Sequence, residues 1–119
     1  ERCVDHVVFV KSDAEGHDLN ILVGADKTLQ LGKVDVWQFE YNHRWIGGRS
    51  FLKDVFDFIR DKPYLIGKLY GNGIETYDTW HPELERFIES NYVLIRKRSR
   101  FERLCTRVRF NNSNVLIPG

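Results

Sequence analysis

Two short stretches of this 119-residue sequence hold the side chains best suited to chemistry. Each directly follows or closes an apolar run, one around residues 7–10 and the other over residues 34–41. The candidate residues are Asp13, Glu15, His17, Glu40, Asn42, His43 and Trp45. Facing carboxylates can coordinate a hard cation, act as a general base on a hydroxyl, or bind a cationic substrate group. Two plainer interpretations stay open: acidic residues that only favour the positive end of a helix, and histidines that only lie on the surface.

The surrounding pattern predicts how these stretches are positioned. His6–Lys11 (HVVFVK) and Val34–Tyr41 (VDVWQFEY) are typical of strands, and apolar residues at helical spacing run from Asp18 to a stop at Gly32. Strand, helix and strand in this order predict a right-handed βαβ unit with parallel strands. Because ligands bind beyond the carboxyl ends of such strands, we expect Asp13 and Glu40 to face one crevice.

The rest of the chain predicts a second helix and antiparallel strands. Ser50 is a suitable N-cap for a helix that ends before Pro63. Asn72-Gly73 between the runs 64–70 and 74–77 indicates a hairpin. A short helix over 83–89, with Leu84, Phe87 and Ile88 inward, and a last strand over 91–95 complete the prediction. The chain is thus expected to be one α/β domain over residues 1–97, half of a three-layer sheet, followed by a basic tail over 98–119.

Charge is concentrated near the end of a chain whose formal net charge is only +1. Residues 96–110 contain seven basic residues and one acidic residue. Four apolar residues interleave with them, namely Phe101, Leu104, Val108 and Phe110. The interleaved apolar residues favour a segment that is packed or covered by a partner over a solvated tail or a nucleic-acid contact. An anionic lipid surface or an acidic face of the same protein could also bind the basic residues.

Several classes of protein are disfavoured by what the sequence lacks. Its apolar runs are far shorter than the roughly 20 residues that cross a bilayer, and residues 1–6 do not resemble a secretory signal, so we expect a cytoplasmic location and no membrane span. Cys3 and Cys105 are expected to be reduced thiols. Methionine is absent, which suggests a processed, trimmed or fragmentary chain. The signatures GxGxxG, P-loop, HExxH, GxSxG and CxxC are absent.

A family resemblance rests on the two chemical stretches. Lys11–Asp18 reads KSDAEGHD, Gly24-Ala25 lies in the following helix, and Val36–Asn42 reads VWQFEYN. This resembles the FkbM methyltransferase pattern, in which a strand ending in K-I-D-x-E-G-H-E precedes a helix with a K-G-A-like segment and a strand ending in F-E. Ser12 and Ala14 depart from that pattern without removing a reactive side chain. Similar segments at 49–52 and 90–95 extend the resemblance to about residues 6–97.

The resemblance implies a Rossmann-like class I methyltransferase fold in which these strands are the fourth to seventh, so that only the C-terminal half is present. It implies transfer of a methyl group from S-adenosylmethionine to a hydroxyl of a sugar or small molecule. By match to the motif, Asp13, Glu15, His17 and Glu40 would be catalytic. Asn42, His43 and Trp45 would contact the acceptor. From the residues alone, Trp37, Trp45 and Trp80 are interpreted as core or pocket-wall residues, although Trp45, in a glycine-containing loop, could close over a ligand. A divalent cation, if used, would bind Asp13 and Glu40.

The same resemblance implies that the main cofactor-binding elements, a glycine-rich turn and an acidic residue after the first two strands, lie outside this chain. We therefore expect weak or no cofactor binding by the chain alone and an unpaired edge on the strand at 7–10, where either a homodimer forms or an omitted N-terminal segment pairs. A non-catalytic interaction module on a methyltransferase scaffold is the main alternative. Nucleic-acid binding rests on the basic tail alone and is not favoured.

Overall fold

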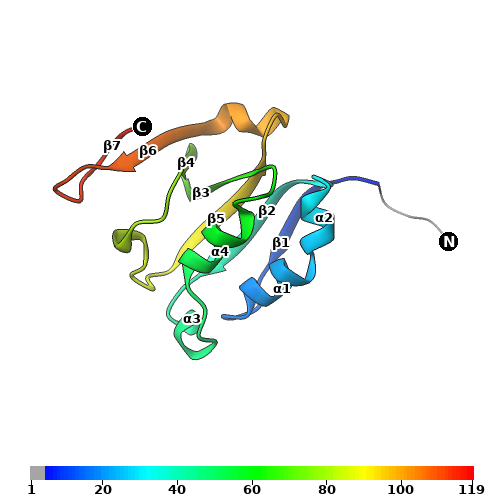
Figure 1. Ribbon diagram of the computed structural model, residues 1–119, viewed down its shortest axis with the longest axis horizontal. Coiled ribbons are helices and arrows are strands. Elements are labelled where there is room, and N and C mark those ends of the chain that lie inside the picture. The colour runs from blue at the N-terminus through cyan, green and yellow to red at the C-terminus, as the bar shows by residue number, and fades with distance from the viewer. Residues whose placement is uncertain (1–4) are drawn as a thin grey trace.

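The computed structural model describes residues 5–119. The first half contains β1 (Val7–Ser12), α1 (Asp18–Gly24), α2 (Asp26–Gln30), β2 (Val34–Tyr41), α3 (Arg44–Gly47) and α4 (Leu52–Ile59). The second half contains β3 (Tyr64–Tyr70), β4 (Gly73–Tyr77), the 3-10 helix η1 (Pro82–Leu84), β5 (Ser90–Arg96), the 3-10 helix η2 (Arg100–Leu104), β6 (Cys105–Phe110) and β7 (Leu116–Pro118). Figure 1 shows these elements arranged around one sheet.

The seven strands form a single mixed sheet in the order β1-β2-β5-β3-β4-β6-β7. β1 and β2 are parallel, which confirms the predicted βαβ unit. β5 lies between β2 and β3 and is antiparallel to both, so β2 and β3 run in the same direction. The β3–β4 hairpin also forms as predicted, with a two-residue turn at Gly71 and Asn72 and with Gly73 as the first residue of β4. The fold is therefore mixed α/β, with antiparallel strands following a parallel pair.

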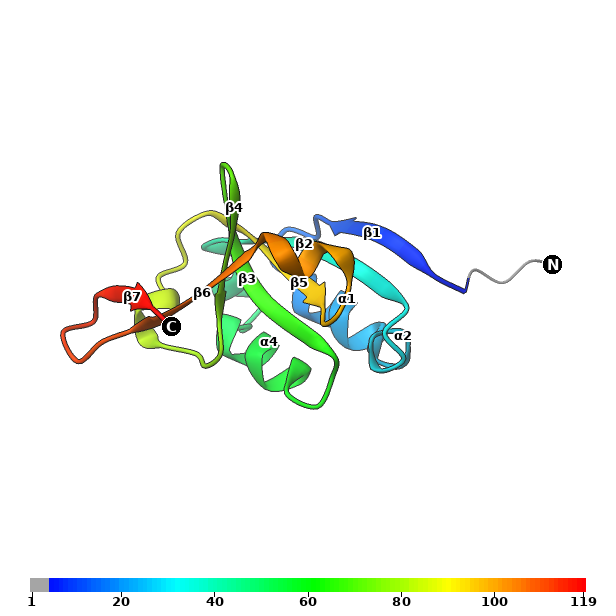
Figure 2. The same ribbon diagram turned by 90° about the horizontal axis from the view of Figure 1, so that it is seen from above.

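The main core lies between the sheet and one layer of helices. α1, α2 and α4 cover the same face of the sheet (Figure 2). Alternate residues of β2, namely Trp37, Phe39 and Tyr41, enter this core, as the predicted alternation required. α4 contributes four buried side chains at helical spacing, Leu52, Val55, Phe56 and Ile59. Burial of each of these side chains contributes about 2 kcal/mol to folding.

The opposite face of the sheet carries a smaller apolar cluster and only a short cover. Val36, Ile74, Val93 and Ile95 form this cluster, and Phe101 of η2 packs against it. Figure 2 shows η2, in orange between β5 and β6, on the side of the sheet away from the helices. The residues described here thus show one full helical layer rather than two.

The C-terminal segment continues the sheet. β6 pairs in parallel with β4, and β7 pairs with β6. Three of its four interleaved apolar residues, Phe101, Val108 and Phe110, pack against the core clusters, whereas Leu104 is 48% exposed. The interpretation as a packed segment is confirmed, and that of a solvated tail is wrong. Cys105 is half-buried, and Cys3 lies outside the described residues.

Three sequence predictions about helices need correction. The helix predicted from Asp18 is broken at Ala25 into α1 and α2. The residue before α4 is Phe51 rather than Ser50, whose hydroxyl bonds back to Gly48. The helix predicted over 83–89 is only the 3-10 turn η1, and Ile88, expected to face inward, is 65% exposed.

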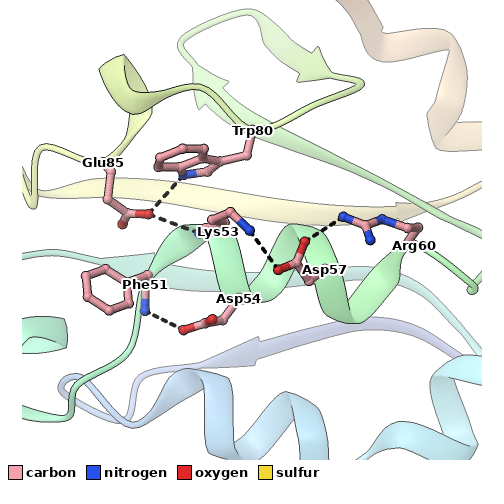
Figure 3. Close-up of polar contacts among 7 residues, drawn as sticks. All are labelled: Phe51, Lys53, Asp54, Asp57, Arg60, Trp80 and Glu85. Carbon is pink, nitrogen blue, oxygen red and sulfur yellow. Dashed lines mark hydrogen bonds and ion pairs between the residues drawn. The ribbon is translucent and has the colours of Figure 1, made fainter.

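One carboxylate, Glu85, explains the last two corrections. Its oxygens accept hydrogen bonds from the backbone N–H groups of Leu52 at 2.8 Å and Lys53 at 3.0 Å, which are free at the start of α4. Figure 3 shows Glu85 with Lys53 and Trp80. The same carboxylate accepts from the Tyr41 hydroxyl at 2.7 Å and the Trp80 indole at 2.9 Å. Glu85 is held at the start of α4, and Phe87 just after it has a φ of +57°, so this segment does not continue as a helix.

Candidate active site

The parallel pairing of β1 and β2 brings the two chemical stretches to one edge of the sheet. Ser12 pairs with Phe39, so the loop after β1 begins beside the last residues of β2. Backbone atoms of the two loops are then in contact. A Cβ atom built on Gly16 would lie 2.5 Å from the carbonyl oxygen of Arg44, and Gly16 has a φ of +99°. Only glycine fits this position, so the loops are locked together by their backbones.

The buried carboxylate of Asp18 joins the same two loops, and sequence analysis missed this role. Its oxygens accept hydrogen bonds from the backbone N–H of Ala14 at 2.9 Å and of Glu40 at 3.3 Å. The Ser12 hydroxyl donates to it at 3.4 Å and accepts from the Trp37 indole at 3.1 Å. Asp18 is fully buried, and this burial raises its pKa despite the bonds to the carboxylate. It does more than favour the positive end of α1, since it positions Glu40.

Asp13 and Glu40 lie close enough for the charge of Asp13 to act on Glu40. Asp13 is exposed and Glu40 is partly buried. Burial raises the pKa of Glu40; the nearby carboxylate of Glu89 and then that of Asp13 raise it further, while Arg44 opposes them. Glu40 therefore holds a proton more readily than an ordinary glutamate does.

Glu89 is a second residue that sequence analysis did not identify. β5 runs antiparallel to β2, with Ser90 opposite Tyr41, so the residue before β5 reaches the end of β2. The sequence could have indicated Glu89 only after β5 had been predicted to pair with β2. Glu89 adds a third carboxylate to the edge that carries Asp13 and Glu40.

The other predicted catalytic residues lie at the same edge but on the surface. Glu15 is exposed, adopts a φ of +50°, and lies 3.7 Å from the Arg44 guanidinium. His17 and His43 are exposed, each directly before a short helix. Neither imidazole hydrogen-bonds to another side chain within residues 5–119. The structure thus places both histidines within this edge without giving them a fixed orientation.

Asn42 and Trp45 support the edge from inside; for Trp45 this confirms a core residue and excludes closure over a ligand. The indole of Trp45 is fully buried and donates to the backbone carbonyl of Glu40 at 3.0 Å. It cannot close over a ligand because its ring packs against Phe39 and Tyr41. Asn42 is also buried, and its side-chain oxygen accepts from the backbone N–H of Arg44 at 2.9 Å. Both residues hold the loop after β2 in place.

Comparison with known proteins adds one decisive match. The model of the methyltransferase FkbM domain matches residues 3–66, more than half of the chain. The chain belongs to the FkbM methyltransferase family. The match covers β1, the helices after it, β2 and α4, and therefore both loops of the candidate site. No curated protein and no solved structure matches the chain.

Within the described part of this FkbM-family chain, no three His, Cys, Asp or Glu side chains gather in a metal-binding arrangement. Two hollows, of about 400 and 210 Å³, lie elsewhere. The larger is lined by α4, the start of β3 and residues 77–80, and the smaller by residues 77–81 and 108–110. Neither is lined by a predicted catalytic residue. No helix among residues 5–119 is long and apolar enough to cross a bilayer.

Proposed function

We propose that this chain forms the C-terminal half of an S-adenosylmethionine-dependent methyltransferase domain that methylates a hydroxyl oxygen of a sugar or small molecule. The observation that carries the proposal is the meeting of Asp13 and Glu40 at the shared carboxyl edge of β1 and β2 within a family-matched segment. Ligands of parallel α/β sheets bind at such an edge. The parallel pair followed by antiparallel strands also agrees with the Rossmann-like arrangement that the resemblance implies.

The residues present fit the acceptor side of the reaction better than the cofactor side. The loop with Gly16 is filled by the backbone of Arg44 and offers no free cradle for a nucleotide. When bound, the cofactor would supply an electrophilic methyl group; we assign its binding mainly to residues outside this segment. No step through the cofactor is derived from the residues described here.

In this proposal the carboxylates act on the acceptor. Asp13, which is exposed, accepts the proton of the acceptor hydroxyl, whereas burial and neighbouring carboxylates raise the pKa of Glu40. Glu40, held by Asp18 through its backbone and by Trp45 through its carbonyl, orients the hydroxyl by a hydrogen bond. A divalent cation bound by Asp13 and Glu40 would serve the same orienting purpose. His17 is the alternative proton acceptor.

The test is the change Asp13→Ala in the complete enzyme. Loss of a general base should lower turnover by about 100-fold or more, while an exposed side chain contributes little to stability. Asp78→Ala is the matched control, because Asp78 is also an exposed carboxylate and makes one surface ion pair, with Arg107 at 2.7 Å. Equal turnover of the Asp13 variant and the unchanged enzyme would exclude the assignment.

A non-catalytic interaction module on the same scaffold is the second candidate. The exposed basic segment around η2 favours this second candidate, because an enzyme that acts on small molecules does not require such a surface. The two functions are distinguished by methyl transfer itself, which the interaction module would lack in the complete protein.

A further inference from the structure

The face of the sheet opposite the helices carries a group of exposed cations. Sheet register places Arg109 on the same side as Cys105, which packs against the cluster on this face. By the same alternation, Lys11 and Glu40 also lie on this face, but at the β1–β2 edge, where carboxylates surround Lys11. η2 and the turn before it add Arg98, Arg100 and Arg103, all exposed. We call Arg98, Arg100, Arg103 and Arg109 and the surface around them the basic face.

These cations have no ion-pair partner among residues 5–119, unlike their neighbours in the chain. Arg96 is bound to Asp35 at 2.9 Å, and Arg107 is bound to Asp78 at 2.7 Å. The two aspartates thus neutralise two basic residues of segment 96–110 that are not part of the basic face. The charges of the basic face remain available to an anionic partner.

Packing holds this surface in a defined shape. Phe101 and Cys105, at the two ends of η2, pack against the apolar cluster. The guanidinium of Arg100 lies 4.9 Å from the centre of the Phe101 ring. Glu102 accepts a hydrogen bond from the backbone N–H of Arg98 at 2.6 Å, which fixes the turn before η2. The cations are therefore presented by ordered backbone and not by a loose tail.

The side chains beside the cations indicate the kind of partner. Leu104, at the end of η2, is 48% exposed, and Phe9, which pairs with Val36, is 52% exposed. Cations combined with protruding apolar side chains are the pattern of a surface that lies on an anionic bilayer. A single-stranded nucleic acid would instead stack several bases on free aromatic rings; the ring of Phe101 is covered by Arg100 and the cluster, and Phe9 on β1 is the exposed ring named on this face.

We propose that the basic face binds peripherally to a membrane surface containing anionic phospholipids, with Leu104 and Phe9 entering the interfacial region. The contact is peripheral, in agreement with the short apolar runs of the chain. It is independent of methyl transfer and would bring the domain to a membrane-bound partner or acceptor.

The test is co-sedimentation of this chain with vesicles of phosphatidylcholine alone or of phosphatidylcholine mixed with phosphatidylserine. We expect binding to the mixed vesicles only, and its loss at high salt because the charges are exposed. Each basic residue at such a surface strengthens binding about five-fold, so the double change Arg100→Gln and Arg103→Gln should weaken it roughly 25-fold. A second pair, Arg103→Gln and Arg109→Gln, should act similarly and leaves the Arg100–Phe101 contact intact.

The matched control is Lys27→Gln with Arg49→Gln, which removes the same charge from exposed positions outside the basic face. It should retain most of the binding. Equal weakening by both pairs, binding to phosphatidylcholine alone, or no binding to either vesicle would overturn the proposal. Tighter binding of a single-stranded RNA oligonucleotide than of the vesicles, lost in the same arginine variants, would overturn it in favour of a nucleic-acid partner.

Discussion

Replacement of Glu85 by glutamine should destabilise the fold far more than replacement of an ordinary surface carboxylate. The Glu85 carboxylate accepts four hydrogen bonds, including those from the Tyr41 hydroxyl and the first backbone N–H groups of α4. A glutamine side chain has one acceptor oxygen, so its amide nitrogen must face one pair of these donors. Those two donors lose their acceptor oxygen while they remain partly buried.

The expected cost follows from the groups left without a partner. An unsatisfied buried donor costs about 1–3 kcal/mol, and loss of a helix cap costs about 1 kcal/mol. Because part of the affected region can reach water, we expect a loss of about 3 kcal/mol in the free energy of unfolding for Glu85→Gln. With a urea m-value of about 1–3 kcal/mol/M, the midpoint should fall by roughly 1–3 M.

Urea unfolding followed by circular dichroism measures this loss. Glu83→Gln is the control, because Glu83 makes an exposed ion pair with Arg86 at 2.6 Å and should cost less than about 1 kcal/mol. A double-mutant cycle with Tyr41→Phe then isolates the Tyr41–Glu85 contact, and we expect a coupling energy above about 1 kcal/mol. If Glu85→Gln costs no more than Glu83→Gln, the network is not formed in solution and the reasoning is refuted.

Three further predictions concern pH, backbone fit and assembly. Burial acts to raise the pKa of Asp35, but hydrogen bonds, first from Arg96, outweigh burial and lower this pKa. The ionised Asp35 should therefore stabilise the fold above about pH 4, and this stabilisation should be lost as pH falls through the folded-state pKa. Asp35→Asn should abolish that part of the acid dependence of urea unfolding. Gly16→Ala should cost about 3 kcal/mol by thermal unfolding, since its Cβ atom would lie 2.5 Å from the Arg44 carbonyl oxygen; an unchanged midpoint would show that the loops are not in contact. β1 pairs only with β2 among the described strands, so the chain should dimerise through the other edge of β1. Val8→Lys should then favour the monomer in light scattering. A monomer in which the β1 amides are protected from hydrogen exchange would contradict this prediction.

The strand framework was predictable because local alternation and turn residues specify it. The apolar alternation of 34–41 fixed which residues of β2 enter the core, and Asn72-Gly73 fixed the hairpin. Because parallel pairing of β1 and β2 follows from the βαβ order, the meeting of Asp13 and Glu40 could also be predicted. These features depend on contacts that are close in sequence or required by chain connectivity.

Two failures involve hydrogen bonds between residues far apart in the sequence. The apolar pattern of 84–88 favoured a helix, but Glu85 binds the start of α4, more than 30 residues earlier in the chain. Trp45, by contrast, is the core residue that the sequence indicated, with its indole buried against Phe39 and Tyr41. The role of Asp18 depends on the Glu40 backbone, 22 positions away. A local sequence pattern does not specify such partners.

The measurement that tests the central claim most directly is isothermal titration with S-adenosylmethionine. It should be made on this chain and on the same chain extended upstream in its gene to include a glycine-rich turn. We expect measurable binding only by the longer protein, because the residues described here provide carboxylates for the acceptor but no cradle for the cofactor. Tight binding by the short chain would contradict our assignment of the cofactor site. Failure of both proteins to bind would contradict the methyltransferase function and favour the interaction module.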